Sequence, residues 1–236
     1  MENKKNSKKQ IVLIIITSVI FLSLVIGASF AYFAAEQNGA GTIPTTVSTK
    51  TIDTVVFSTS KMQNGVEVTG PAEIIIDATP DNFGISNDDL IGSAKAKVTL
   101  TTSNAPNYTV SKKFGLYLKI LSNNFTYSSD SSTPDLIINE VVLNGDISPW
   151  DIPGLEEKHM IDNKGYQIYG WDITTLPAGT EIELDSTTLT LTTDASGGSK
   201  TETMEWKVGI KLVNYPHNQN NITNKSFTAK LELREI

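Results

Sequence analysis

The sequence predicts an all-β protein, an antiparallel β-sandwich that is jelly-roll-like and preceded by one N-terminal hydrophobic helix. Beyond the N-terminal apolar run, short stretches of β-branched and aromatic residues alternate with turn signals such as Asn64-Gly65. No apolar period of 3.6 residues extends over a long window there, so no further long helix is expected. The connections after Asp77 and around Asp146 are long, which suits strands that cross between two sheets. A β-barrel is the alternative.

The hydrophobic helix is expected in residues 11–33, a long apolar stretch without a charged side chain. Four lysines precede it, at Lys4, Lys5, Lys8 and Lys9. A basic head followed by an apolar segment is what an export machinery recognises, and the lysines stay on the cytoplasmic side. The sequence therefore predicts that the remaining chain is exported, to the cell surface or the extracellular space.

Residues 1–33 are interpreted as a signal peptide or a transmembrane anchor. The apolar run exceeds the roughly 7–15 residues of a signal-peptide core and approaches the roughly 20 residues that span a bilayer, which favours an anchor. Against this, Ser29-Phe30-Ala31 fits a small-x-small cleavage site, which predicts cleavage between Ala31 and Tyr32. If uncleaved, residues 11–33 would hold the protein in the membrane. If cleaved, signal peptidase would release it.

The end of this segment carries a resemblance to a known group. The lysine-rich head, the apolar run and Gly27-Ala28-Ser29-Phe30-Ala31-Tyr32-Phe33 together resemble the signal of SipW-dependent exported proteins of Gram-positive bacteria. That group includes the TasA and camelysin biofilm-fibre proteins. Its signal usually ends in Gly-x-Thr-x-Ala-Tyr/Phe-Phe, and Ser29 stands where threonine is common. The resemblance implies an export route and says little about the domain that follows.

The C-terminal half resembles a widespread set of uncharacterised Firmicutes and mollicute-like surface proteins. Three pieces carry this resemblance: Asn124-Phe125-Thr126-Tyr127 with Thr133-Pro134-Asp135-Leu136; Gly170-Trp171-Asp172-Ile173-Thr174; and Trp206 through Asn218-Gln219-Asn220-Asn221 to Lys225-Ser226-Phe227. The resemblance implies a surface location and no particular activity.

Residues 34–48 are small, polar and punctuated by glycine and proline, which predicts a flexible linker or arm. Residues 49–236 are expected to form a single β-sandwich domain. The first strands are expected in the runs KTIDTVVFS, VEVTG and PAEIIIDA, with a loop at 79–93. The later strands are expected at 94–102, 113–121, 136–143 (interrupted at Asn139-Glu140), 166–173, 181–184, 188–193, 205–213 and 226–235.

Two strands show the clearest alternation, which is typical of a sheet with one buried face. Their inward-facing residues are expected to be Ala96, Val98 and Leu100, and Phe114, Leu116, Leu118 and Ile120. Residues 146–164 are expected to be irregular, and residues 194–199 a hairpin or loop tip. The aromatic residues are interpreted chiefly as core and sheet-face side chains.

The formal charge of the chain is −7, and because residues 1–31 hold four lysines and one glutamate, the exported part would carry −10. Such a surface repels nucleic acid and anionic lipid, so neither is an expected ligand. There is no cysteine, which excludes disulfides, thiol catalysis and thiolate metal sites.

No catalytic motif is found, so the protein is not expected to be an enzyme or to need a cofactor. The two histidines, His159 and His217, have no nucleophilic or zinc motif around them. The loop from Asp77 to Asp89 is rich in oxygen ligands but lacks the Asp-x-Asp-x-Asp-Gly order of a calcium loop. It is interpreted as a solvated acidic loop, with calcium binding left open. The Asn/Gln-rich segment 214–224 is explained by Asx-turns.

Three functions follow in order of preference. The first is a surface or matrix structural protein, such as a fibre or biofilm subunit that self-associates by strand addition, with residues 34–57 as the donor strand. The second is a carbohydrate- or protein-binding adhesin, which exposed Trp150, Trp171 or Tyr169 on one concave face would favour. The third is a hydrolase, which no site signature supports.

Overall fold

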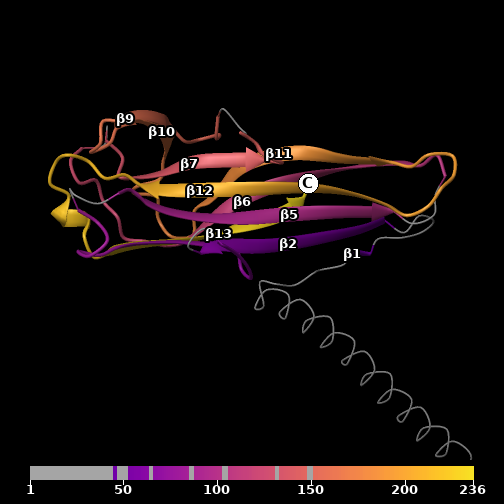
Figure 1. Cartoon of the computed structure of the whole chain (residues 1–236), viewed down its shortest axis with the longest axis horizontal. Coiled ribbons are helices and arrows are strands. Elements are labelled where there is room, and N and C mark those ends of the chain that lie inside the picture. The colour runs from indigo at the N-terminus through magenta and orange to yellow at the C-terminus, as the bar shows by residue number, and fades with distance from the viewer. Residues whose placement is uncertain are drawn as a thin grey trace, which may run out of the picture.

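The computed structural model describes residues 45–46, 53–63, 66–84, 88–102, 106–130, 133–147 and 151–236. These residues form an all-β structure of antiparallel sheets, as the sequence predicts (Figure 1). The N-terminal helix, the cleavage site at Ala31 and Tyr32, and most of the arm 34–48 lie outside the described residues, so they stay predictions. The described part of the chain contains no helix that could serve as a membrane span.

The larger sheet has the strand order β1-β2-β5-β12-β7-β10-β9, with β3 paired to β2 and β8 paired to β7. Its strands are β1 (Thr45–Thr46), β2 (Asp53–Gln63), β3 (Val66–Thr69), β5 (Leu90–Thr102), β7 (Leu136–Leu143), β8 (Asp146–Ile147), β9 (Glu157–Ile161), β10 (Gln167–Asp172) and β12 (Lys200–Leu212).

The smaller sheet has the order β11-β6-β13-β4. Its strands are β4 (Glu73–Ala78), β6 (Thr109–Asn123), β11 (Glu181–Thr192) and β13 (Lys225–Glu235), and a short 3₁₀ turn, η1 (Asn220–Ile222), precedes β13. From β4 to β7, and again from β10 to β13, the chain changes sheet at every strand.

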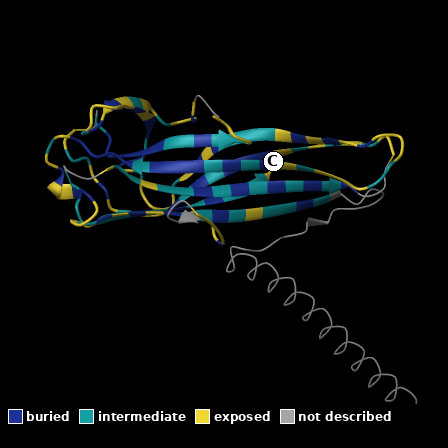
Figure 2. Ribbon diagram, in the orientation of Figure 1, coloured by how far each residue is buried: buried dark blue, intermediate teal, exposed yellow. Residues whose placement is uncertain are grey.

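The two sheets pack face to face around one apolar core, which makes the structure sandwich-like. The residues expected to face inward from β5 and β6 are buried, and side chains of both sheets belong to the same cluster. Figure 2 shows this alternation as bands of buried and partly exposed residues along the long strands. Burying one face of the long strands supplies the main favourable free energy of such a fold.

Strand β11 is continuous, although the sequence suggested two strands at 181–184 and 188–193. Its buried apolar residues are Ile182 and Leu184, and then Leu189 and Leu191, so their phase changes within the strand. Because side chains alternate with a period of two, only an extra residue can keep both halves on the inner face. The register shifts between Glu183 and Asp185 accordingly.

Two further expectations can be compared with the structure. Of the two alternatives for residues 194–199, a hairpin or a loop tip, the structure shows a loop, because β11 and β12 belong to different sheets and this segment crosses between them. It is bonded to the β5–β6 crossover, where Asn107 N donates to Asp194 O at 2.8 Å, at the opposite end of the sandwich from η1 (Figure 1). The segment 146–164 is not wholly irregular, because it contains β8 and β9, and β9 pairs with β10.

The register shift in β11 lies beside a hydrogen bond from Trp206 to Asp185, which can be tested by substitution. Asp185 Oδ2 accepts a hydrogen bond of 2.8 Å from Nε1 of Trp206, whose side chain is fully buried. Substituting Asp185→Ala leaves that N–H without its partner, which should lower the free energy of unfolding by about 1–3 kcal/mol. Urea denaturation measures the change. Glu183→Ala, at an exposed position of the same strand, should change it by less than about 0.5 kcal/mol; equal effects would contradict the role given to Asp185.

Candidate functional site

A buried carboxylate organises the loops at the η1 end of the sandwich. Asp135 immediately precedes β7 and is fully buried. Its Oδ1 accepts hydrogen bonds from Ser128 Oγ at 2.5 Å and from Gln219 Nε2 at 2.7 Å, and its Oδ2 accepts one from Ser128 N at 2.6 Å. Burial raises the pKa of Asp135, while the hydrogen bonds from Ser128 and Gln219 oppose that rise.

The loop between β12 and η1 is fastened to this carboxylate by further buried contacts. Gln219 Nε2 also donates to Val213 O at 3.0 Å, and its Oε1 accepts from Tyr215 N at 2.7 Å. The Tyr215 hydroxyl donates to Pro134 O at 2.7 Å. Burial, followed by the negative charge of Asp135, raises the pKa of Tyr215, so the phenol stays protonated and keeps donating.

The three sequence pieces singled out in the C-terminal half meet here. Within them, the Tyr127 hydroxyl donates to Asp172 Oδ2 at 2.8 Å, and Thr174 Oγ1 accepts from Leu136 N at 3.0 Å. Asn221 Nδ2 donates to Tyr127 O at 3.1 Å, which adds the third piece. The sequence predicts the local turns within each piece. It does not predict the contacts between the pieces, because these join residues that are far apart in the chain.

Ser128, His217 and Asp135 come together without forming a nucleophilic triad. Ser128 Oγ lies 3.0 Å from His217 Nε2, but its proton is donated to Asp135. In a hydrolytic triad the histidine lies between the serine and the acid, so that it can take the serine proton. Here the serine is in the middle, and the His217 ring stacks on Tyr215 with centroids 5.1 Å apart. The arrangement holds loops together and does not activate the hydroxyl.

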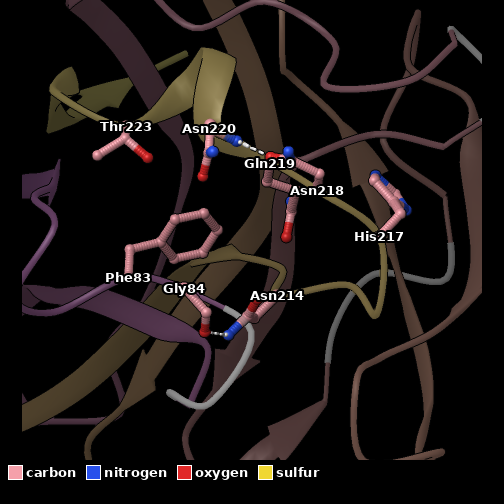
Figure 3. Close-up of a pocket in the computed structure, with 8 residues that line it drawn as sticks. All are labelled: Phe83, Gly84, Asn214, His217, Asn218, Gln219, Asn220 and Thr223. Carbon is pink, nitrogen blue, oxygen red and sulfur yellow. Dashed lines mark hydrogen bonds between the residues drawn. The ribbon is translucent and has the colours of Figure 1, made fainter.

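A pocket opens beside this cluster, between the loop after β4 and the loop before β13 (Figure 3). It has a volume of about 150 Å³ and is open to solvent. Its walls are Phe83, Gly84, Asn214, His217, Asn218, Gln219, Asn220 and Thr223. Asn214 Nδ2 donates to Gly84 O and so joins the two loops. The lining contains no Asp, Glu, Lys or Arg. The sequence predicted turns in 214–224 but not this pocket, because Phe83 and Gly84 come from a distant loop.

The aromatic residues considered for an adhesin face differ in exposure where the structure describes them. Trp171 is buried in the core, with 8% of its surface exposed. Tyr169 is 48% exposed and packs edge-to-face on His159, with ring centroids 4.7 Å apart. Trp150 lies outside the described residues. The described aromatics therefore do not form the stacking platform that was considered.

The acidic loop after β4 shows no cation site among its described residues. Asn82 Oδ1 accepts from Thr79 N at 2.8 Å, and Asn82 Nδ2 donates to Asp77 O at 2.9 Å. Asp89 pairs with Lys211 Nζ at 3.0 Å. Residues 85–87 lie outside the described part, and within that part no three His, Cys, Asp or Glu side chains are placed to hold a metal ion together.

No protein-family model matches this chain, and no curated protein matches it.

The raised pKa of Asp135 makes its contribution to stability dependent on pH. Between the ordinary aspartate pKa of 3.8 and the raised value, the folded state holds a proton that the unfolded state has lost, so the free energy of unfolding falls as the pH rises through this window. Asp135→Asn cannot titrate, and its Nδ2 cannot accept the hydrogen bond that Ser128 N donates. The substitution should cost about 1–3 kcal/mol below pH 3.8 and less above the raised pKa.

Urea unfolding of both proteins across this pH range measures the difference. Asp151→Asn, at an exposed position, is the matched control and should change the free energy of unfolding by less than about 0.5 kcal/mol. A difference between the wild type and Asp135→Asn that is constant with pH would contradict the raised pKa.

Proposed function

We propose that this chain is an exported cell-surface or extracellular-matrix protein of a Gram-positive bacterium, a fibre or biofilm subunit that assembles by strand addition. The export-type N-terminus and the acidic composition support an extracellular role. The protein acts through contacts between its surfaces, with the membrane as a further partner if residues 11–33 stay uncleaved.

We interpret the strand order as a jelly roll. Strands β4-β13-β6-β11 face β5-β12-β7-β10, and two interlocked Greek keys produce this order. Strands β1 to β3 stand outside this set of eight and extend the larger sheet beyond β5. The N-terminal strand β2 is therefore an addition to an edge.

This added strand is the observation that carries the proposal. β2 pairs with β5 over its length, from Asp53 opposite Thr102 to Met62 opposite Ser93. Val55 is 1% exposed, and Phe57 packs edge-on against Phe114 with ring centroids 5.9 Å apart. The edge of β5 thus has both backbone partners and an apolar surface for an N-terminal strand, whichever molecule supplies it.

The same contacts change the proposal about the arm. Residues 34–57 were expected to be a donor strand, yet residues 53–57 are already paired with β5 of their own chain. Addition between molecules therefore requires that β2 leave its own sheet and enter that of a neighbour. Such an exchange of identical elements keeps every native contact and links successive molecules.

The absence of natural cysteine allows a direct test of exchange. Val56 lies opposite Thr99 in the β2–β5 pair. Chains carrying Val56→Cys alone and chains carrying Thr99→Cys alone are unfolded together, refolded at high concentration and treated with a short thiol-specific cross-linker. Strand exchange should give covalent heterodimers in the assembled fraction, resolved by denaturing electrophoresis.

The control replaces Thr99→Cys by Thr188→Cys, an exposed position on β11 in the other sheet. That mixture should give few cross-links. If the Val56/Thr99 mixture gives no heterodimer while the double variant in one chain cross-links internally, β2 stays in its own sheet and exchange is rejected.

Export has its own test. N-terminal sequencing of the protein from its native cell should give Tyr32 as the first residue. Ala31→Trp should block cleavage, because a large side chain does not fit a small-x-small site, and the product should keep the mass of the uncleaved chain. A native protein that begins at Met1 would show an anchored protein, and an uncleaved chain in the cytosol would reject export.

A further inference from the structure

The pocket at the η1 end differs in character from the rest of this acidic protein. The chain carries a formal charge of −7, yet the pocket walls contribute side-chain amides, a hydroxyl, an aromatic ring and one histidine. A charged ligand would lose its hydration there without meeting an opposite charge, which is costly. A neutral polar ligand would exchange its hydrogen bonds with water for hydrogen bonds with the walls.

The hydrogen-bonding groups of the walls divide into two sets. Gln219 is buried and uses both of its amide atoms to hold the loop. Asn220 and Thr223 differ, because their side chains form no hydrogen bond with any described residue. Asn218 uses only Oδ1, which accepts from Asn220 N at 2.8 Å, and its Nδ2 is open. The side chains of Asn218, Asn220 and Thr223 therefore offer neighbouring donors and acceptors to a ligand in the pocket.

The walls are also held in place before any ligand arrives. Phe83 is 3% exposed, and its N–H donates to Thr79 O at 3.0 Å. Asn224 N donates to Ala78 O at 2.6 Å, which ties the end of the second loop to β4. In the view of Figure 3, the Phe83 ring lies between the Asn220 side chain and the bond from Asn214 to Gly84. A rigid site loses little conformational entropy on binding.

We propose that this pocket binds one neutral sugar unit of a glycan. Sugar hydroxyls both donate and accept, and they match the side-chain amides of Asn218 and Asn220 and the hydroxyl of Thr223. The site lies in loops at the end of the sandwich, away from the β2–β5 pair, and so does not depend on strand exchange.

Saturation-transfer NMR on the full chain tests this proposal, with the protein in dodecylphosphocholine micelles so that no sugar-based detergent competes. The probes are glucose, galactose, mannose and their N-acetylamino forms, with glucuronic acid as a charged comparison. At least one neutral sugar should receive saturation, and glucuronic acid should receive less. The double variant Asn220→Ala/Thr223→Val should weaken binding about tenfold.

Asn221→Ala is the matched control, because Asn221 neighbours Asn220 but bonds to Tyr127 O and does not line the pocket. It should keep the wild-type signal, and near-ultraviolet circular dichroism should confirm that all variants fold. No transfer to any neutral sugar, or transfer that the double variant leaves unchanged, overturns the proposal. Transfer only to N-acetylasparagine amide, added as a peptide probe, overturns it in favour of a peptide ligand.

Discussion

Each long strand must bury one of its two faces, and the whole sandwich depends on this constraint. β5 meets it with alternation from Ala94 onward, and β6 meets it with apolar residues alternating from Phe114 to Ile120. β11 and β7 do not, because the phase of their apolar residues changes midway, and in each the register shifts where the phase changes. In β11 this shift brings Asp185 to the core side, where it bonds to Trp206 and so joins the two sheets. The hydrogen bond between Asp185 and Trp206 therefore follows from the register shift, which β11 needs in order to bury the apolar residues of both its halves.

The loops at the η1 end combine buried apolar side chains, such as Phe125 and Ile222, with buried polar contacts. Asp135 and Gln219 supply a buried polar network in which the carboxylate bonds to two other segments, the one around Ser128 and the loop that carries Gln219. A buried carboxylate costs desolvation energy, so such a network favours one loop arrangement more than it adds stability. That single arrangement shapes the pocket, whose walls come from two loops far apart in the chain.

The N-terminal strand β2 stabilises the sandwich and is also the strand proposed to exchange between molecules. Val55 and Phe57 contribute to the core, so β2 stabilises the sandwich while it occupies an edge. No disulfide fixes it there, because the chain has no cysteine. Backbone pairing and apolar packing hold β2 against β5, and a second molecule offers identical contacts. The surface proposed for assembly and the pocket proposed for a sugar involve different elements, so a fibre subunit could carry both.

Alternation by itself located most of the strands, because a half-buried strand needs nothing beyond its own sequence to show which face is apolar. Phe114, Leu116, Leu118 and Ile120 were assigned to the core on that ground, and they lie there. The short strand β9 gave too few alternating residues to be recognised. Composition alone also indicated an acidic, cysteine-free chain behind an export-type N-terminus.

Only the tertiary structure decided which sheet each strand joins, that residues 194–199 cross between sheets, and that Asp135 meets Gln219. Those contacts join residues up to 89 positions apart within the polar cluster alone. Such pairings depend on how the two sheets stack. The alternation of apolar and polar residues along one strand shows which face is buried, but it does not show which strand or loop covers that face.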